Sequence, residues 1–106
     1  MEKTMEIRNN VSISCDVSLI MRIVLLSKAG QQMLWYMLWK QAQGAKVDEH
    51  GYMRVKYRDA QNVLCMQSKT HPYLGLQNLL EANFIERGPV AGWYRITVEG
   101  IGLVEH

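Results

Sequence analysis

The chain is poor in cysteine and proline, with two of each among its 106 residues. Small secreted domains held together by disulfides carry several cysteine pairs, so Cys15 and Cys65 predict free thiols in a reducing compartment. No apolar run follows a basic start within residues 1–10, and this argues against a secretory signal peptide. We therefore expect a cytoplasmic protein.

Long hydrophobic runs and a strong charge of either sign are also missing. The apolar blocks Leu19–Leu26 and Met33–Trp39 are far shorter than the roughly 20 residues that cross a bilayer. The net charge is +2, and 48% hydrophobic with 21% charged residues is an ordinary globular composition. This length fits one domain and excludes multidomain enzymes and large cofactor-binding folds.

The N-terminal quarter predicts a strand followed by an apolar helix. Val11–Cys15 alternates apolar and polar residues as a half-buried strand does, and Asp16 or Ser18 offers a helix N-cap. In Leu19–Leu26 only Arg22 is polar, and a helix that is apolar all round needs burial on every side. The sequence leaves two locations possible for this helix: the core of its own domain and the interface of a dimer.

Three further helices are predicted from apolar residues at spacings of three and four, over residues 31–43, 57–66 and 72–83. Gly44 closes the first of them, and Pro72 suits the first turn of the last. The second places Tyr57 inward and Cys65 on its buried face. Gly75 weakens the last helix by about 1 kcal/mol relative to alanine, so we expect close packing there.

Short strands complete the order of elements. Tyr52–Val55 is a strand candidate after the long central helix. Phe84–Arg87 and Trp93–Thr97 alternate apolar and polar residues around the glycine-bounded turn Gly88–Gly92, and this predicts a hairpin. We expect the tail Val98–Val104 to continue as a short helix.

The predicted elements follow the order of a winged helix-turn-helix: helix, short strand, helix, polar turn, helix and hairpin. Leu79–Arg87 and Gly92–Gly100 resemble the end of MarR- and PadR-type winged-helix domains, which read L-x-x-x-G-[LI]-I-x-R, a short wing and Y-x-[LI]-T-x-x-G. Asn83 stands where those families usually carry glycine, and asparagine tolerates the left-handed conformation that a helix C-terminus needs.

The resemblance covers residues 31–104 and extends to small plasmid and phage proteins, such as RepL-like replication initiators and TubR-like centromere-binding proteins. It implies a single α+β domain that is mostly helical, with a C-terminal two-stranded wing. Residues 28–104 form its winged-helix core. Residues 1–27 form an N-terminal extension suited to dimerisation.

The resemblance also implies binding to double-stranded DNA, because the third helix of a winged helix enters the major groove. Gln77 is the first candidate for base reading, since glutamine pairs with adenine through two hydrogen bonds. The candidate DNA-binding residues are Lys56, Arg58, Ser68, Lys69, Thr70, His71, Tyr73, Gln77, Asn78, Arg87, Trp93 and Arg95.

The charge distribution agrees with this assignment. Residues 54–95 hold six basic and three acidic residues, a net +3, and the remaining residues sum to −1. One copy offers few phosphate contacts, whereas two copies supply about six to eight, enough for usable affinity and a steep salt dependence. We therefore expect a homodimer.

No pattern for catalysis or for a bound cofactor or metal is present. The histidines His50, His71 and His106 and the two cysteines match no zinc spacing, so we expect no enzyme and no metal site. Two functions stay open. The first is sequence-specific DNA binding, as a transcriptional regulator or as a plasmid or phage partition or replication factor. The second is a protein-interaction module, an adaptor or inhibitor of a host protein, that uses Trp93 and Val90 on the wing.

Overall fold

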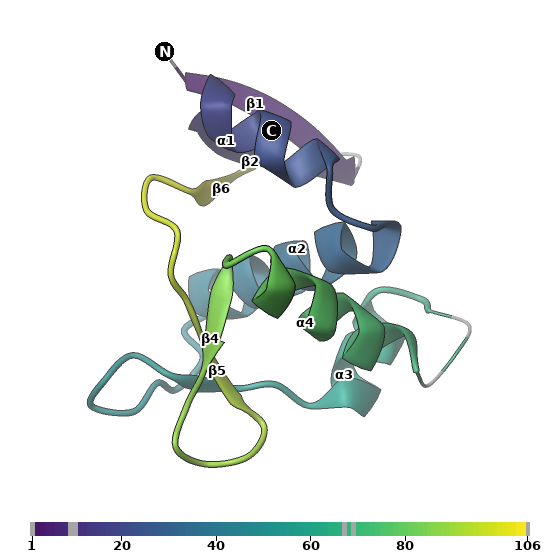
Figure 1. The fold of residues 1–106 in the computed structure, drawn as a ribbon, viewed down its shortest axis with the longest axis vertical. Coiled ribbons are helices and arrows are strands. Elements are labelled where there is room, and N and C mark those ends of the chain that lie inside the picture. Colours follow the sequence, from purple (N-terminus) through teal and green to yellow (C-terminus); the bar gives the residue numbers. More distant parts are fainter. Residues whose placement is uncertain (1, 9–10, 67, 69, 106) are drawn as a thin grey trace.

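The computed structural model describes residues 2–8, 11–66, 68 and 70–105. Within them the chain forms two units (Figure 1), and the predicted α+β class is confirmed. The helices are α1 (Val17–Val24), α2 (Lys28–Ala42), α3 (Tyr57–Val63) and α4 (His71–Glu81). The strands are β1 (Glu2–Arg8), β2 (Val11–Asp16), β3 (Met53–Arg54), β4 (Ile85–Arg87), β5 (Trp93–Ile96) and β6 (Gly102–Glu105). None of the described helices is long and apolar enough to cross a bilayer.

The N-terminal unit is an antiparallel sheet in the order β1-β2-β6, with α1 packed on β1 and β2. The predicted strand in residues 11–15 is confirmed as β2, whose Ile13 and Cys15 are fully buried. The helix expected in residues 98–104 is wrong. The chain turns at Gly100, where φ is +71°, and β6 then pairs with the free side of β2. Both ends of the chain therefore meet in one sheet.

Helix α2 forms the centre of the second unit. Residues 33–38 are all buried, so the aromatic and methionine-rich stretch is core. The helix begins at Lys28, three residues earlier than predicted, because the Ser27 hydroxyl accepts a hydrogen bond from the Gly30 backbone N–H at 3.0 Å. Gly44 follows the helix with φ +81°, as its sequence position predicts.

The contact between α2 and α4 explains the glycine inside α4. A Cβ atom at Gly75 would lie 2.4 Å from the backbone oxygen of Ala29 and 2.5 Å from Cγ of Met33. The close packing expected at Gly75 is therefore confirmed. It fixes which side of α4 faces inward and leaves the opposite side to solvent.

The second sheet has the order β3-β5-β4 and contains the predicted hairpin. Asn83 precedes β4 with φ +61°, the left-handed conformation expected of it. Helix α3 ends earlier than predicted, and the expectation of a buried Cys65 is wrong. The chain leaves the helix at Cys65 with φ +54°, and the thiol is exposed.

Helix α1 is buried on one side and exposed on the other. Leu19 and Ile23 are buried against the sheet, whereas other apolar side chains of the helix point to solvent. Arg22 connects α1 to the second unit. Its guanidinium donates a hydrogen bond to the backbone oxygen of Ala82 at 3.2 Å and lies 4.9 Å from the centre of the Phe84 ring.

Candidate nucleic-acid interface

The outward side of α4 is the first part of the candidate interface. Pro72, Gly75, Leu76 and Leu79 are buried on the inward side. Tyr73 and Leu74 are 46% and 52% exposed, and Gln77 is half-buried one turn further along. The N-terminal half of α4 therefore presents aromatic, aliphatic and amide side chains to solvent.

A cleft of about 290 Å³ lies between this side of α4 and the β4–β5 hairpin. Among its lining residues are Tyr57, Tyr73, Gln77, Arg87 and Trp93. Four of these were predicted site residues that lie far apart in the sequence, and the fold brings them together. We call this feature the α4–hairpin cleft.

Tyr57 is a cleft residue that is not among the candidate DNA-binding residues predicted from the sequence. It is 38% exposed rather than inward, and its ring meets that of Tyr73 edge-on, with 6.4 Å between the ring centres. Partial burial and a hydrogen bond with Tyr94 raise the pKa of Tyr57 to about 12. The phenol is therefore neutral at physiological pH and keeps its proton for hydrogen bonding.

One basic side chain lines the cleft, and two more adjoin the cleft residue Tyr57 in the chain. Lys56 and Arg58 flank Tyr57 in the chain, Arg87 lines the cleft, and all three are exposed. Within the described part of the chain, none of the three forms an ion pair with an acidic side chain. The charges of Arg58 and Arg87 are available to an anionic partner, whereas Lys56 also helps to lower the pKa of Asp59.

Arg95, the other arginine of the hairpin, is engaged within the protein. It forms an ion pair with Glu86 and donates a hydrogen bond to the backbone oxygen of His50 at 2.7 Å. Its guanidinium also lies 4.6 Å from the centre of the Tyr52 ring. Hydrogen bonds from Tyr52 and Arg95 hold the pKa of Glu86 below its ordinary value. Arg95 is thus part of a polar network with the loop before β3.

Asn78 is turned toward α2. Its side-chain oxygen accepts a hydrogen bond from the Ser27 backbone N–H at 3.0 Å. A Cβ atom at Gly30 would lie 2.2 Å from the same oxygen, so the amide fits tightly against the start of α2. Asn78 holds the two helices together at this point.

The residues before α4 are placed in part. Lys69 lies outside the described residues. The Ser68 hydroxyl accepts a hydrogen bond from the Thr70 backbone N–H at 3.2 Å, and this shapes the turn into the helix. His71 is exposed and borders a different pocket, with Lys28 and Cys65 among its neighbours. It does not line the α4–hairpin cleft.

A polar contact connects helix α3 to α2. The Tyr36 hydroxyl donates a hydrogen bond to the Asp59 carboxylate, and the Lys40 ammonium lies 3.3 Å from the same oxygen. The hydrogen bond from Tyr36, together with Lys40, holds the pKa of Asp59 below its ordinary value. Burial and the bond to Asp59 raise the pKa of Tyr36.

This contact predicts a pH-dependent part of the stability. Because the folded state lowers the pKa of Asp59, the stabilisation is present above the pKa of the unfolded carboxyl, about 4, and is lost as the pH falls below it. In urea unfolding, Asp59→Asn is expected to be less stable than the wild type at pH 7. The two are expected to converge near pH 2.5. An equal difference at both pH values would contradict this role.

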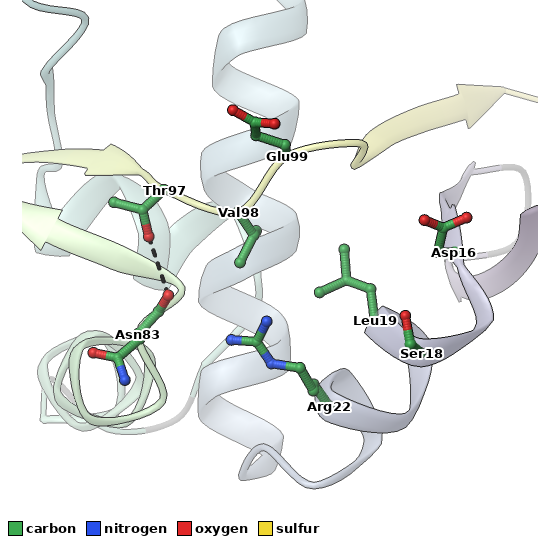
Figure 2. A pocket seen from close by; sticks show the side chains of 8 residues that line it. All are labelled: Asp16, Ser18, Leu19, Arg22, Asn83, Thr97, Val98 and Glu99. Carbon is green, nitrogen blue, oxygen red and sulfur yellow. Dashed lines mark hydrogen bonds between the residues drawn. The ribbon is translucent and has the colours of Figure 1, made fainter.

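A second pocket, of about 370 Å³, lies where the two units meet (Figure 2). Arg22 points into it from α1, and the Thr97 hydroxyl donates a hydrogen bond to the backbone oxygen of Asn83 at 3.0 Å on the other side. Asp16 and Glu99 are its acidic residues. Within the described residues, no three histidine, cysteine or acidic side chains are grouped as a metal site requires. The contacts of Arg22 make this pocket a junction between the units.

No known protein family matches the chain, and no curated protein or solved structure is significantly similar to it.

Proposed function

We propose that this protein is a winged helix-turn-helix that binds double-stranded DNA. Helices α3 and α4 form the helix-turn-helix, α4 enters the major groove, and the β4–β5 hairpin is the wing. The observation that carries the proposal is the α4–hairpin cleft. There the solvent side of α4 and Arg87 face the same opening, and the exposed Lys56 and Arg58 adjoin the cleft residue Tyr57 in the chain.

The distribution of charge indicates which end of α4 would approach the DNA. Glu81, at the C-terminal end of α4, is exposed and would be repelled by phosphates. The basic residues flank Tyr57, which contacts Tyr73 near the start of α4. The N-terminal half of α4 therefore lies deepest in the groove, the usual orientation of a recognition helix.

The side chains of α4 favour adenine and thymine in the DNA site. The helix contains no arginine or lysine, the residues that most often read guanine. Gln77 matches the donor and acceptor of adenine, and Leu74 suits the methyl group of thymine. We expect A·T base pairs at the centre of each half-site.

The test is selection of binding sites from random duplexes, followed by titration of Gln77→Ala. Loss of one bidentate base contact costs about 1–3 kcal/mol, so the variant is expected to bind about 5- to 150-fold more weakly for each half-site that it contacts. Binding to random duplex is expected to change little. Selected sites rich in G·C, or unchanged discrimination in Gln77→Ala, would contradict this role.

Asn78→Ala is the matched control. The side chain is adjacent to Gln77 but bonds to Ser27. Its loss is expected to cost about 1 kcal/mol of stability through the unpaired backbone N–H, with no change in base preference. A thermal unfolding curve and the same titration measure both effects.

The proposal covers a transcriptional regulator and a plasmid or phage partition or replication factor, all of which need a DNA site. The alternative function is a protein-interaction module. It is favoured by Val90, which is 60% exposed at the hairpin turn beside the half-buried Trp93. In that case Val90→Asp is expected to abolish partner binding, whereas changes at Gln77 have no effect.

A further inference from the structure

A further pocket, of about 200 Å³, lies where α2, β3 and the beginning of α3 meet. All of its lining side chains carry an ionisable group, and they are Tyr36, Lys40, Arg54, Lys56 and Asp59. None of them lines the α4–hairpin cleft. We call this feature the basic pocket.

The positive charge of the basic pocket comes from separate parts of the chain. Lys40 lies in the last turn of α2. Met53 and Val55 are buried, and the alternation along the extended chain places Arg54 and Lys56 together on the opposite, exposed side. The fold therefore brings three cationic side chains from two distant segments to one opening.

The single acidic side chain of the basic pocket already has partners. The Tyr36 hydroxyl and the Lys40 ammonium both contact the same carboxylate oxygen of Asp59. Among the described residues, neither Arg54 nor Lys56 forms an ion pair with an acidic side chain. Three positive charges thus line the basic pocket with one negative charge, and its net charge is +2.

We propose that the basic pocket binds a phosphate group. This inference does not rest on the proposed DNA binding. A guanidinium presents parallel N–H donors to two oxygens of an oxyanion, and each ammonium has three donors. Arg54 and Lys56 therefore supply donors for several oxygens of a tetrahedral phosphate, and Lys40 has donors beyond its contact with Asp59.

Charge and size fit one phosphate group. A phosphate monoester carries a charge of about −1.5 to −2 at pH 7, which balances the net +2 of the basic pocket. The volume of about 200 Å³ equals the share of about seven water molecules in the liquid, enough for a phosphate group and some water. It is smaller than the roughly 300–1,000 Å³ of pockets that enclose a drug-sized ligand. The same chemistry suits a free phosphate and a phosphate of the DNA backbone.

Inorganic phosphate is the probe, titrated into the full chain at constant ionic strength and followed by two-dimensional NMR of the backbone amides. Saturable shifts are expected at Tyr36, Lys40 and Asp59. Half-saturation is expected at about 1 mM, well within the affinity limit for a ligand of five heavy atoms. Shifts that rise without saturation, or that lie outside the basic pocket, would overturn the proposal.

Arg54→Gln tests the pocket directly. The position is exposed, so the substitution is expected to leave the fold intact. Loss of the charge-assisted hydrogen bonds is expected to weaken phosphate binding at least about 10-fold. Lys46→Gln removes the same charge from an exposed residue outside both the basic pocket and the cleft, and it is expected to bind as the wild type does. An Arg54→Gln protein with wild-type affinity for phosphate would refute the proposal.

The salt dependence of DNA binding distinguishes the two sources of the phosphate. If the DNA backbone supplies it, the slope of log K against log salt is expected to be about 0.9 less steep per chain in Arg54→Gln. A wild-type slope, together with binding of inorganic phosphate, assigns the basic pocket to a free phosphate or a phosphate monoester. The phosphate titration contains no DNA, so failure of this proposal is distinct from failure of DNA binding.

Discussion

Arg58→Glu/Arg87→Glu is expected to lower the affinity for duplex DNA at least about 100-fold at 100 mM salt. Each phosphate contact releases about 0.9 counterion, so the loss of two contacts per copy removes much of the electrostatic part of binding. Replacement by glutamate adds repulsion to this loss. Fluorescence anisotropy with a labelled random duplex measures the effect.

The fold is expected to tolerate both substitutions. Arg58 and Arg87 are exposed, and neither forms an ion pair with an acidic side chain of the described chain. Such surface changes alter stability by about 0.5 kcal/mol or less. The single variants Arg58→Glu and Arg87→Glu are compared with Lys46→Glu, which makes the same change of charge elsewhere. Lys46 is exposed in the loop between α2 and β3 and does not line the cleft. Equal losses in Lys46→Glu and Arg87→Glu would show a general charge effect and contradict a specific interface.

Gly75→Ala is expected to destabilise the protein by about 2 kcal/mol, although alanine is the better helix former by about 1 kcal/mol. The added methyl group would meet the Ala29 backbone oxygen, which cannot move without shifting α2. For a domain of this size the melting temperature is expected to fall by about 10 °C. The movement of α4 is also expected to weaken DNA binding.

Gly102→Ala is the control for this substitution. A Cβ atom there has no neighbour within 4 Å, so we expect little change in stability. Thermal unfolding followed by circular dichroism compares the two variants with the wild type. A Gly75→Ala protein as stable as the wild type would mean that α2 and α4 are not in close contact.

Local patterns in the sequence predicted most of the second unit. The helices around Met33–Leu38 and Leu76–Leu79 follow from apolar spacing, and the hairpin follows from two alternating runs around Gly88–Gly92. Strand β6 was missed because its partner β2 is about ninety residues away, and a local pattern cannot show such a pairing. Strand β1 was missed although Met5 and Ile7 alternate with charged residues, the period of a half-buried strand.

The candidate site was predicted in part. Gln77 and Asn78 differ by one step of about 100° around α4, and this step turns one to the cleft and the other to Ser27. The sequence placed α4 but not its rotation, so both were candidates.

The two hairpin arginines differ for another reason. Register pairs Arg95 with Glu86 across the hairpin, and the loop before β3 supplies further partners to Arg95. Arg87 pairs in register with Tyr94 and keeps its charge free for the cleft. The cross-strand pair of opposite charges was a signal in the sequence for the ion pair of Arg95 with Glu86.

The measurement that tests DNA binding most directly is the affinity of the wild type for random duplex DNA as a function of salt, from about 50 to 200 mM. With Lys56, Arg58 and Arg87 on phosphates, log K is expected to fall with log salt at a slope of about −2.7 per bound chain, or about −5 for a dimer. Absence of binding at 50 mM salt, or a slope near zero, would contradict the proposed function.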